Sequence, residues 1–331
     1  MINQKILDSI LHQFIGLERL AGGAIDRFLP LLQEIDERLI GAYSVSYGGS
    51  LGAQRKFINK VKELKTLAYA NFEKEFTKEL IELATNQSQL MSGMFSGYFG
   101  KSLANSPGQA AVDKIINSEI RGFTMSQWII GLKNSDISKY VATAKTAVLD
   151  GLTLEHAIDS LERLHVRRDH KTKALVKTLI TGFANKANVA VFRENKTLIK
   201  GFKLVVTFDS KTTPICIQHS ADDILYTFDN YLVPPFHVGC RTILVPVTYS
   251  WQELGARNRR KVPVGTRQSM DGGTPITNTY PKWLKGQSKE IQDDVLGKTF
   301  GRMFRTGKYK LTRFIDPTGK LYTIKELFKI T

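Results

Sequence analysis

Apolar residues recur at helical spacing along most of the first 195 residues, and this periodicity constrains the fold more than any other feature. An apolar residue at every third or fourth position is typical of a helix with one buried face. Three such stretches run from Ile6 to Leu20, from Ile25 to Ile40 and from Phe57 to Leu83. The glycine pair at 22–23 predicts a tight hairpin between the first two helices, and the glycine-rich segment 48–52 predicts a break before the third.

Residues 91–108 interrupt the helical pattern, and residues 126–195 resume it. Residues 91–108 interleave glycine, serine, methionine and aromatics, and a mid-helix glycine costs roughly 1 kcal/mol. A mobile loop or adaptable contact surface is therefore expected there, with an ordinary buried loop as the alternative. From residue 126 to 195 the helical pattern returns. Asp136 and Thr153 are expected to begin helices as N-caps, and a last helix is expected to begin near Asp169.

A β-rich pattern replaces the helical one near Lys196. The strand-like runs are 198–208, 224–228 and 242–247. The predicted fold class is therefore α+β, mostly α. It has a helical N-terminal half, a small β-rich module and a compact α+β C-terminal extension. The expected regions are a helical N-terminal region (1–120), a module of helices followed by a small sheet (125–250) and a basic C-terminal extension (251–331).

The composition excludes several classes of protein. Hydrophobic residues make up 42% of the chain and charged residues 24%, which is typical of a folded domain. The chain has only 2 cysteines in 331 residues, so a disulfide scaffold is excluded. No apolar run approaches the roughly 18 residues of a transmembrane helix, so no membrane span is expected. Asp8 and His12 interrupt the first apolar stretch, unlike the apolar core of a secretion signal.

Positive charge is concentrated near the C-terminus. The net charge of the chain is +16, and residues 241–331 hold 18 basic and 7 acidic residues, a net charge of +11. The densest basic run contains Arg257, Arg259, Arg260 and Lys261. These four residues are predicted to bind nucleic-acid phosphates or an acidic protein surface. The alternative is a solvated linker, because glycine and proline residues follow the run.

Both cysteines lie close to histidines in one short stretch. Cys216 and His219 form a C-x2-H pair, His237 and Cys240 form an H-x2-C pair, and 17 residues separate the two histidines. Four such ligands can form a tetrahedral zinc site. The alternative is a core in which the cysteines are small apolar residues and the histidines bind backbone groups. A third interpretation, a thiol-protease arrangement of Cys216 and His237 oriented by Asp209, lacks the glycine-rich oxyanion loop, so no catalytic residues are expected.

These residues belong to a block, 208–247, that resembles the signature of the phage Mu F-type minor head proteins, the phage head morphogenesis family. In that family a strand leads to an Asp-x-x-Thr turn and a cysteine, and a Pro-Pro-x-His-x-x-Cys-Arg segment closes the motif. The matching residues are Asp209, Thr212, Thr213, Cys216, Pro234, Pro235, His237, Cys240 and Arg241. The resemblance extends over roughly residues 125–331. It departs from the family at Gly182, where a glutamate is usual, and at His219, where a small or aliphatic residue is usual.

The resemblance implies a non-enzymatic minor structural protein of a tailed-phage particle. Such proteins associate with the portal vertex during head assembly, and some are packaged and leave with the DNA. The expected partners are the portal protein, other virion proteins and packaged DNA, which would bind by non-specific electrostatics, with several copies of the chain in each particle. The expected location is the virion, assembled in the host cytoplasm. The resemblance implies no cofactor. A zinc ion is considered only because of the spacing of the four Cys and His residues. The alternatives are a metal-dependent nuclease or toxin-like effector and a basic nucleic-acid-binding protein.

Two spatial expectations follow from the motif. Cys216, His237 and Cys240 are expected to lie close together, with Cys216 on a strand–turn and the other two on the returning loop. Arg241 is expected to pair with Asp209 or with backbone carbonyls, because an unpaired buried charge costs about 3–5 kcal/mol.

Overall fold

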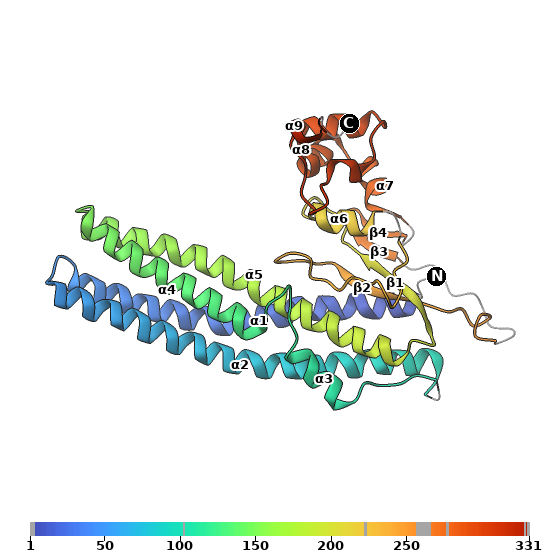
Figure 1. Cartoon of the computed structure of the whole chain (residues 1–331), viewed down its shortest axis with the longest axis horizontal. Helices are drawn as coiled ribbons and strands as arrows, with labels where there is room; N and C mark the ends of the chain where they lie inside the picture. Colours follow the sequence, from blue (N-terminus) through green and yellow to red (C-terminus); the bar gives the residue numbers. More distant parts are fainter. Residues whose placement is uncertain are drawn as a thin grey trace. The chain divides into compact units, whose positions relative to one another are not determined.

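The chain folds into two compact units, each assembled from separated segments. The computed structural model describes residues 4–101, 103–221, 224–255, 266–275, 278–327 and 329. Unit 1 comprises Met1–Phe14, Gln87–Gly108 and Ala184–Thr331, and unit 2 comprises Ile15–Asn86 and Gln109–Phe183. The described residues are mostly helical with small antiparallel sheets, which confirms the predicted α+β, mostly α, fold class (Figure 1). The three consecutive regions expected from the sequence do not coincide with these units.

Helices account for most of the described elements. They are α1 (Gln4–Ser46), α2 (Leu51–Phe99), α3 (Gln109–Ile116), α4 (Met125–Leu149), α5 (Leu154–Glu194), α6 (Pro214–Ser220), α7 (Tyr280–Lys285), α8 (Lys289–Arg305), α9 (Ile324–Leu327) and a 3-10 turn, η1 (Leu311–Phe314). Two antiparallel pairs of strands are described, namely β1 (Ile199–Val205) with β2 (Ile243–Thr248), and β3 (Thr266–Ser269) with β4 (Gly272–Pro275). Within the described residues, no helix has the length and apolarity needed to cross a membrane.

Unit 2 is a bundle in which parts of α1, α2, α4 and α5 lie side by side (Figure 1). The rings of Phe28 in α1 and Phe72 in α2 stack with centroids 3.7 Å apart. The hydroxyl of Tyr43 in α1 donates to the carbonyl of Ala144 in α4 at 2.8 Å. The apolar faces predicted from the periodicity therefore meet in one interior.

A network of charged side chains crosses the interior of this bundle. The ammonium of Lys65 in α2 is fully buried and lies 2.8 Å from Asp36 Oδ1 in α1 and 2.9 Å from Asp136 Oδ2 in α4. Arg168 in α5 also pairs with Asp36 and lies 2.6 Å from Asp169. Each buried charge therefore has an opposite charge beside it, which a low-dielectric interior requires.

Two predictions for the helical half, the hairpin at 22–23 and the loop at 91–108, are wrong, because buried apolar faces keep the helices continuous. Helix α1 passes through the glycine pair at 22–23, with buried alanines on either side. Helix α2 covers half of the segment 91–108, and its buried side chains there recur every four residues: Met91, Phe95 and Phe99. Burying one such side chain contributes roughly 1.5–3 kcal/mol, more than the roughly 1 kcal/mol cost of a glycine. The break expected at 48–52 is confirmed, since residues 47–50 separate α1 from α2.

The helix starts predicted from capping residues have mixed outcomes. Thr153 is confirmed, because its hydroxyl accepts from the backbone N–H three residues later at the start of α5. Asp136 is wrong as a cap, since it lies inside α4, which begins after Thr124 with a reciprocal capping box. The separate helix near Asp169 is also wrong, because α5 is unbroken there. The ion pairs of Arg168 hold that segment in the interior of the bundle.

The sheet of β1 and β2 lies in the first of two cores of unit 1. The ring of Phe192 near the end of α5 lies 6.1 Å from that of Phe95 in α2 and 5.8 Å from that of Phe202 in β1. The register pairs Val205 with Ile243. The run 224–228, expected to be a strand, forms only an isolated bridge between Tyr226 and Phe202.

The second core of unit 1 joins the C-terminal elements to the Cys/His block. Buried residues of α7, α8 and η1 form one cluster with Phe208, Cys216 and Cys240. The ring of Phe208 stacks on that of Trp283 with centroids 5.7 Å apart. The turn predicted after Asp316 is confirmed by the backbone hydrogen bond from its N–H to the carbonyl of Lys320. The C-terminal residues therefore share a core with the motif.

Candidate functional site

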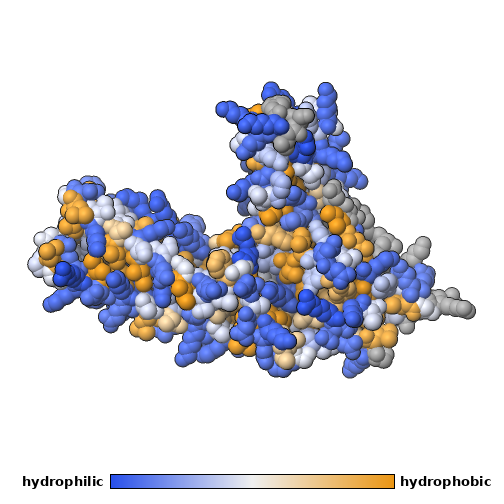
Figure 2. All heavy atoms as spheres, in the orientation of Figure 1, coloured by the Kyte–Doolittle hydropathy of each residue, from blue (hydrophilic) through white to orange (hydrophobic). Residues whose placement is uncertain are grey.

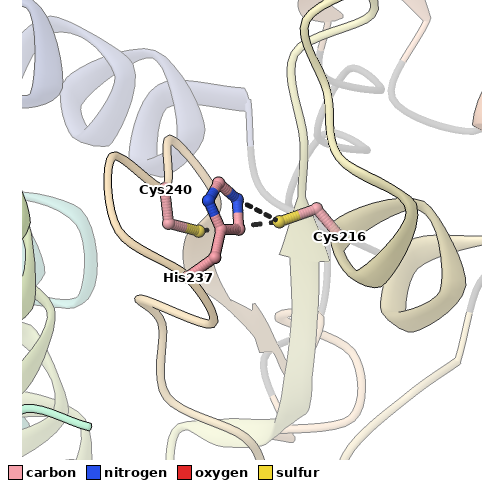
Figure 3. Close-up of side chains that lie close together, drawn as sticks. All are labelled: Cys216, His237 and Cys240. Atoms are coloured by element: carbon pink, nitrogen blue, oxygen red, sulfur yellow. Dashed lines mark hydrogen bonds between the residues drawn. The ribbon is translucent and has the colours of Figure 1, made fainter. Parts of the chain in front are cut away.

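Cys216, His237 and Cys240 form a compact cluster in unit 1 (Figure 3). The two Sγ atoms lie 3.6 Å apart, and His237 Nε2 lies 3.2 Å from Cys216 Sγ. The ligand atoms of all three residues lie within 4.8 Å of one another. The structure thus brings together three of the four residues considered as zinc ligands. Cys216 lies in helix α6 and not on the expected strand–turn.

Local backbone geometry positions these side chains. Thr213 is the N-cap residue of α6, and Pro214 follows it in the first turn, a position that proline favours. On the returning loop, the N–H of Cys240 donates to the carbonyl of His237 at 3.2 Å. This tight turn needs a positive φ of 75° at Gly239, which glycine adopts without strain. The H-x-x-C spacing therefore turns both side chains towards α6.

A hydrogen bond at Nδ1 of His237 determines which of the two ring nitrogens carries the proton. Its Nδ1 lies 2.9 Å from the carbonyl oxygen of Val238. A carbonyl only accepts hydrogen bonds, so Nδ1 carries the proton and donates. In the neutral ring, Nε2 then carries a lone pair directed at the Cys216 sulfur.

The two cysteines are unequal despite similar burial. Cys216 is 2% exposed and Cys240 is 3% exposed. The hydrogen bond between the two sulfurs holds the pKa of Cys240 below its usual value, assisted by hydrogen bonds with Thr242 and the backbone of Phe236. The same bond, together with burial, raises the pKa of Cys216. The two sulfurs share one hydrogen bond, so the two thiols do not ionise independently.

His219 does not join the cluster. It follows Cys216 by three residues in α6, but its ring packs against that of Phe236 with centroids 4.6 Å apart. Burial lowers the pKa of its imidazole, which favours the neutral ring. Its backbone carbonyl accepts a hydrogen bond of 3.0 Å from the hydroxyl of Tyr226. The expected four-residue ligand set is therefore represented by three residues in this structure.

Asp209 forms a bidentate ion pair with Arg241, which is next to Cys240 in the chain. Arg241 Nη1 donates to Asp209 Oδ2 at 2.7 Å, and Nη2 donates to Oδ1 at 2.9 Å. Thr212 also donates to Oδ1 at 3.1 Å. Burial raises the pKa of Asp209, but the bonds and charge of Arg241 outweigh it, so the pKa lies below its usual value. The expected pairing is confirmed, although the Arg241 side chain is 39% exposed and not deeply buried.

Two motif prolines are buried, and two residues that the sequence did not predict contact Asp209 and the cysteines. Pro234 and Pro235 are both buried. Tyr280 of α7, fully buried, donates its hydroxyl to the carbonyl of Asp209 at 2.7 Å. The hydroxyl of Thr242 hydrogen-bonds the cysteine pair, which helps to lower the pKa of Cys240 and partly opposes the rise in the pKa of Cys216. Neither contact could be found from the sequence, because spacing alone does not show which way a single hydroxyl points.

The catalytic interpretation required Asp209 to orient His237. The structure directs the Asp209 carboxylate towards Arg241 and Thr212. It gives His237 Nδ1 the carbonyl of Val238 as its acceptor. A backbone oxygen therefore occupies the place that a thiol-protease arrangement would assign to the carboxylate.

The predicted basic run, Arg257, Arg259, Arg260 and Lys261, lies outside the described residues. Basic side chains nearby in the sequence are exposed on the described C-terminal elements: Lys282, Lys285, Lys289, Lys298 and Arg302. Hydrophilic side chains cover most of the visible surface over α8 (Figure 2). The net charge of residues 241–331 is thus displayed at least partly on folded helices.

Comparison with known proteins assigns no family to this geometry, since no protein-family model, no curated protein and no solved structure matches the chain.

Proposed function

We propose that the chain is a non-enzymatic structural protein of a tailed-phage particle, bound at the portal vertex during head assembly. The observation that carries this proposal is the mutual pairing of the motif residues. Asp209 binds Arg241 and Thr212, while Cys216 contacts both His237 and Cys240. Polar groups that bind one another in this way stabilise a fold. They support the function implied by the resemblance to the phage head morphogenesis family.

The packing of the C-terminal elements supports the same function. Their buried side chains share a core with Phe208 and the two cysteines, and Tyr280 binds the backbone of Asp209. The motif therefore lies inside a larger folded body, and the basic side chains of that body are displayed at its surface. A basic surface suits an anionic partner such as packaged DNA or an acidic portal surface.

Protein analysis of purified particles tests this proposal directly. Particles of the phage whose genome encodes the chain would be purified and analysed by mass spectrometry before and after DNA release. We expect several copies per intact particle. Copies retained after release would indicate a structural joint at the vertex, and copies lost with the DNA would indicate an ejected protein. Intact particles without the chain would contradict the proposal.

A second measurement separates this function from the nuclease alternative. The full chain would be incubated with supercoiled plasmid and Mg2+, Mn2+ or Zn2+. The proposal predicts no cleavage above that of a Cys216→Ser, His237→Ala variant. Metal-dependent nicking that is lost in this variant would favour the enzyme.

A further inference from the structure

We propose that Cys216, His237 and Cys240 bind one Zn2+ ion through three protein ligands, with the fourth position left to water or another donor. This proposal does not depend on the proposed function, because the chain could bind the ion whether or not it belongs to a phage particle.

The spacing of the three ligand atoms fits a tetrahedral ion. Zn–S bonds of about 2.3 Å at tetrahedral angles place two sulfurs about 3.8 Å apart, and a Zn–N bond of about 2.0 Å places nitrogen and sulfur about 3.5 Å apart. The structure has 3.6 Å between the sulfurs and 3.2 Å between His237 Nε2 and Cys216 Sγ. These two separations lie within a few tenths of an ångström of the tetrahedral values, and all three ligand atoms lie within 4.8 Å of one another, so small side-chain movements would admit the ion.

His237 already has the proton arrangement of a metal ligand. Metal-binding histidines usually donate the N–H of the second ring nitrogen to a carbonyl or carboxylate, which fixes the ring and leaves one lone pair for the ion. The bond from Nδ1 to the carbonyl of Val238 meets this condition, and Nε2 points towards Cys216 (Figure 3). No tautomer change is needed for binding.

Charge balance favours a dication with thiolate ligands in this buried position. Two thiolates neutralise the charge of Zn2+, so the loaded site carries no net charge in a place where an isolated charge would be costly. Both cysteines are almost fully buried. Thiolate and imidazole ligands prefer zinc over the oxygen-seeking ions Mg2+ and Ca2+.

The position of the site suggests what the ion would do. It would join α6 to the loop that leads into β2, and Cys216 and Cys240 are 24 positions apart in the chain. Both cysteines belong to the core shared with the C-terminal helices. A metal that binds only the folded state stabilises it, so metal removal is expected to weaken this part of unit 1.

Metal analysis of the full chain tests the proposal. The protein would be produced with zinc in the medium, purified under reducing conditions, and assayed for metal and for free thiols after denaturation. We expect about one zinc per chain, as for a site with one preformed ligand set. Cys216→Ser and Cys240→Ser should lose the metal. His219→Ala should keep it, as should His156→Ala, a control at an exposed histidine of unit 2.

A titration of the wild-type chain decides the matter if the cysteine variants fail to fold. Metal-free protein would be titrated with Co2+, and we expect the sulfur-to-cobalt charge-transfer absorption and the intense visible bands of tetrahedral cobalt. Absence of zinc together with absence of these bands would overturn the site. Loss of both thiols to a disulfide would also overturn it. Loss of zinc in His219→Ala as complete as in Cys216→Ser would overturn the three-ligand assignment in favour of four.

Discussion

Gly319 lies directly against Ile215, the residue that precedes Cys216 in α6, so closely that a methyl group on its Cα would collide with the isoleucine side chain. Its backbone also has a positive φ of 80°. The turn formed between Asp316 and Lys320 therefore contacts the same short helix that carries Cys216. This contact explains why the C-terminal residues and the Cys/His cluster share one core.

Gly319→Ala is expected to destabilise unit 1. The alanine would adopt an unfavourable positive φ and would also displace Ile215, so we expect a loss of roughly 2–4 kcal/mol in the free energy of unfolding. Denaturant unfolding of the full chain would measure it. Gly307→Ala is the matched control, because Gly307 has a φ of 74° and open space around its Cα. Equal losses in the two variants would show that the contact with Ile215 is unimportant.

Lys65→Met is expected to destabilise the helical bundle of unit 2. Removing the ammonium leaves Asp136 buried without its cation and removes one of the two cations that bind Asp36. Breaking a buried ion pair from one side costs about 3–5 kcal/mol. The control is Lys62→Met, at an exposed position of the same helix. Thermal unfolding that gives both variants the same Tm would contradict the buried network.

Arg241→Ala should remove a contribution to stability that depends on pH. The folded-state pKa of Asp209 lies below its usual value. The ion pair therefore contributes above the unfolded pKa of about 3.9, and the contribution is lost as pH falls through the lower folded value. The Arg241 side chain is 39% exposed, so water screens the pair, and we expect only about 1 kcal/mol or less near neutral pH. Unfolding free energies of both proteins between pH 7 and acidic pH would check this.

Asp209→Asn and the double variant complete a cycle that isolates the interaction of this pair from the separate effects of each change. A difference between wild type and Arg241→Ala that stayed constant into the acidic range would show that Arg241 acts through another contact.

The helical half shows how far sequence periodicity reaches. The apolar spacing predicts helical segments where helices occur, but the sequence also predicts breaks at the glycines 22–23 and within 91–108 and helix starts at Asp136 and Asp169 that the structure lacks. Local propensity was outweighed there by tertiary contacts, since Phe95 and Phe99 fill a core with residues about 100 positions away in the sequence. No local pattern contains that information, so the lengths of α1 and α2 could not be predicted.

The sequence predicts the cluster of Cys216, His237 and Cys240 only in part, because some of its geometry is local and some depends on packing. The H-x-x-C turn is local, and its two side chains converge as the spacing indicates. The C-x-x-H pair is local as well, but the direction of the His219 ring depends on Phe236, which lies beyond the helix. Spacing predicts which residues can meet, and packing decides which of them do.

The basic run of residues 257–261 is expected to produce salt-dependent, sequence-independent binding to duplex DNA. Each phosphate that a lysine or arginine neutralises releases counterions, so the logarithm of affinity falls with the logarithm of salt at about 0.9 per contact. Replacing Arg257, Arg259, Arg260 and Lys261 together with alanine should flatten that slope by roughly three to four units if all four contact phosphate. Fluorescence anisotropy of labelled duplexes at several salt concentrations would measure the slope.

A control with the same change of charge distinguishes direct contact from loss of overall charge. Helix α2 carries four exposed basic residues close together, Arg55, Lys56, Lys60 and Lys62. Replacing these four with alanine should leave the slope nearly unchanged, because the proposed phosphate contacts lie elsewhere in the chain. Similar slopes for the wild type and both quadruple variants would identify 257–261 as a solvated linker. An equal decrease in both variants would mean that the attraction follows the net charge of the whole protein and has no local site.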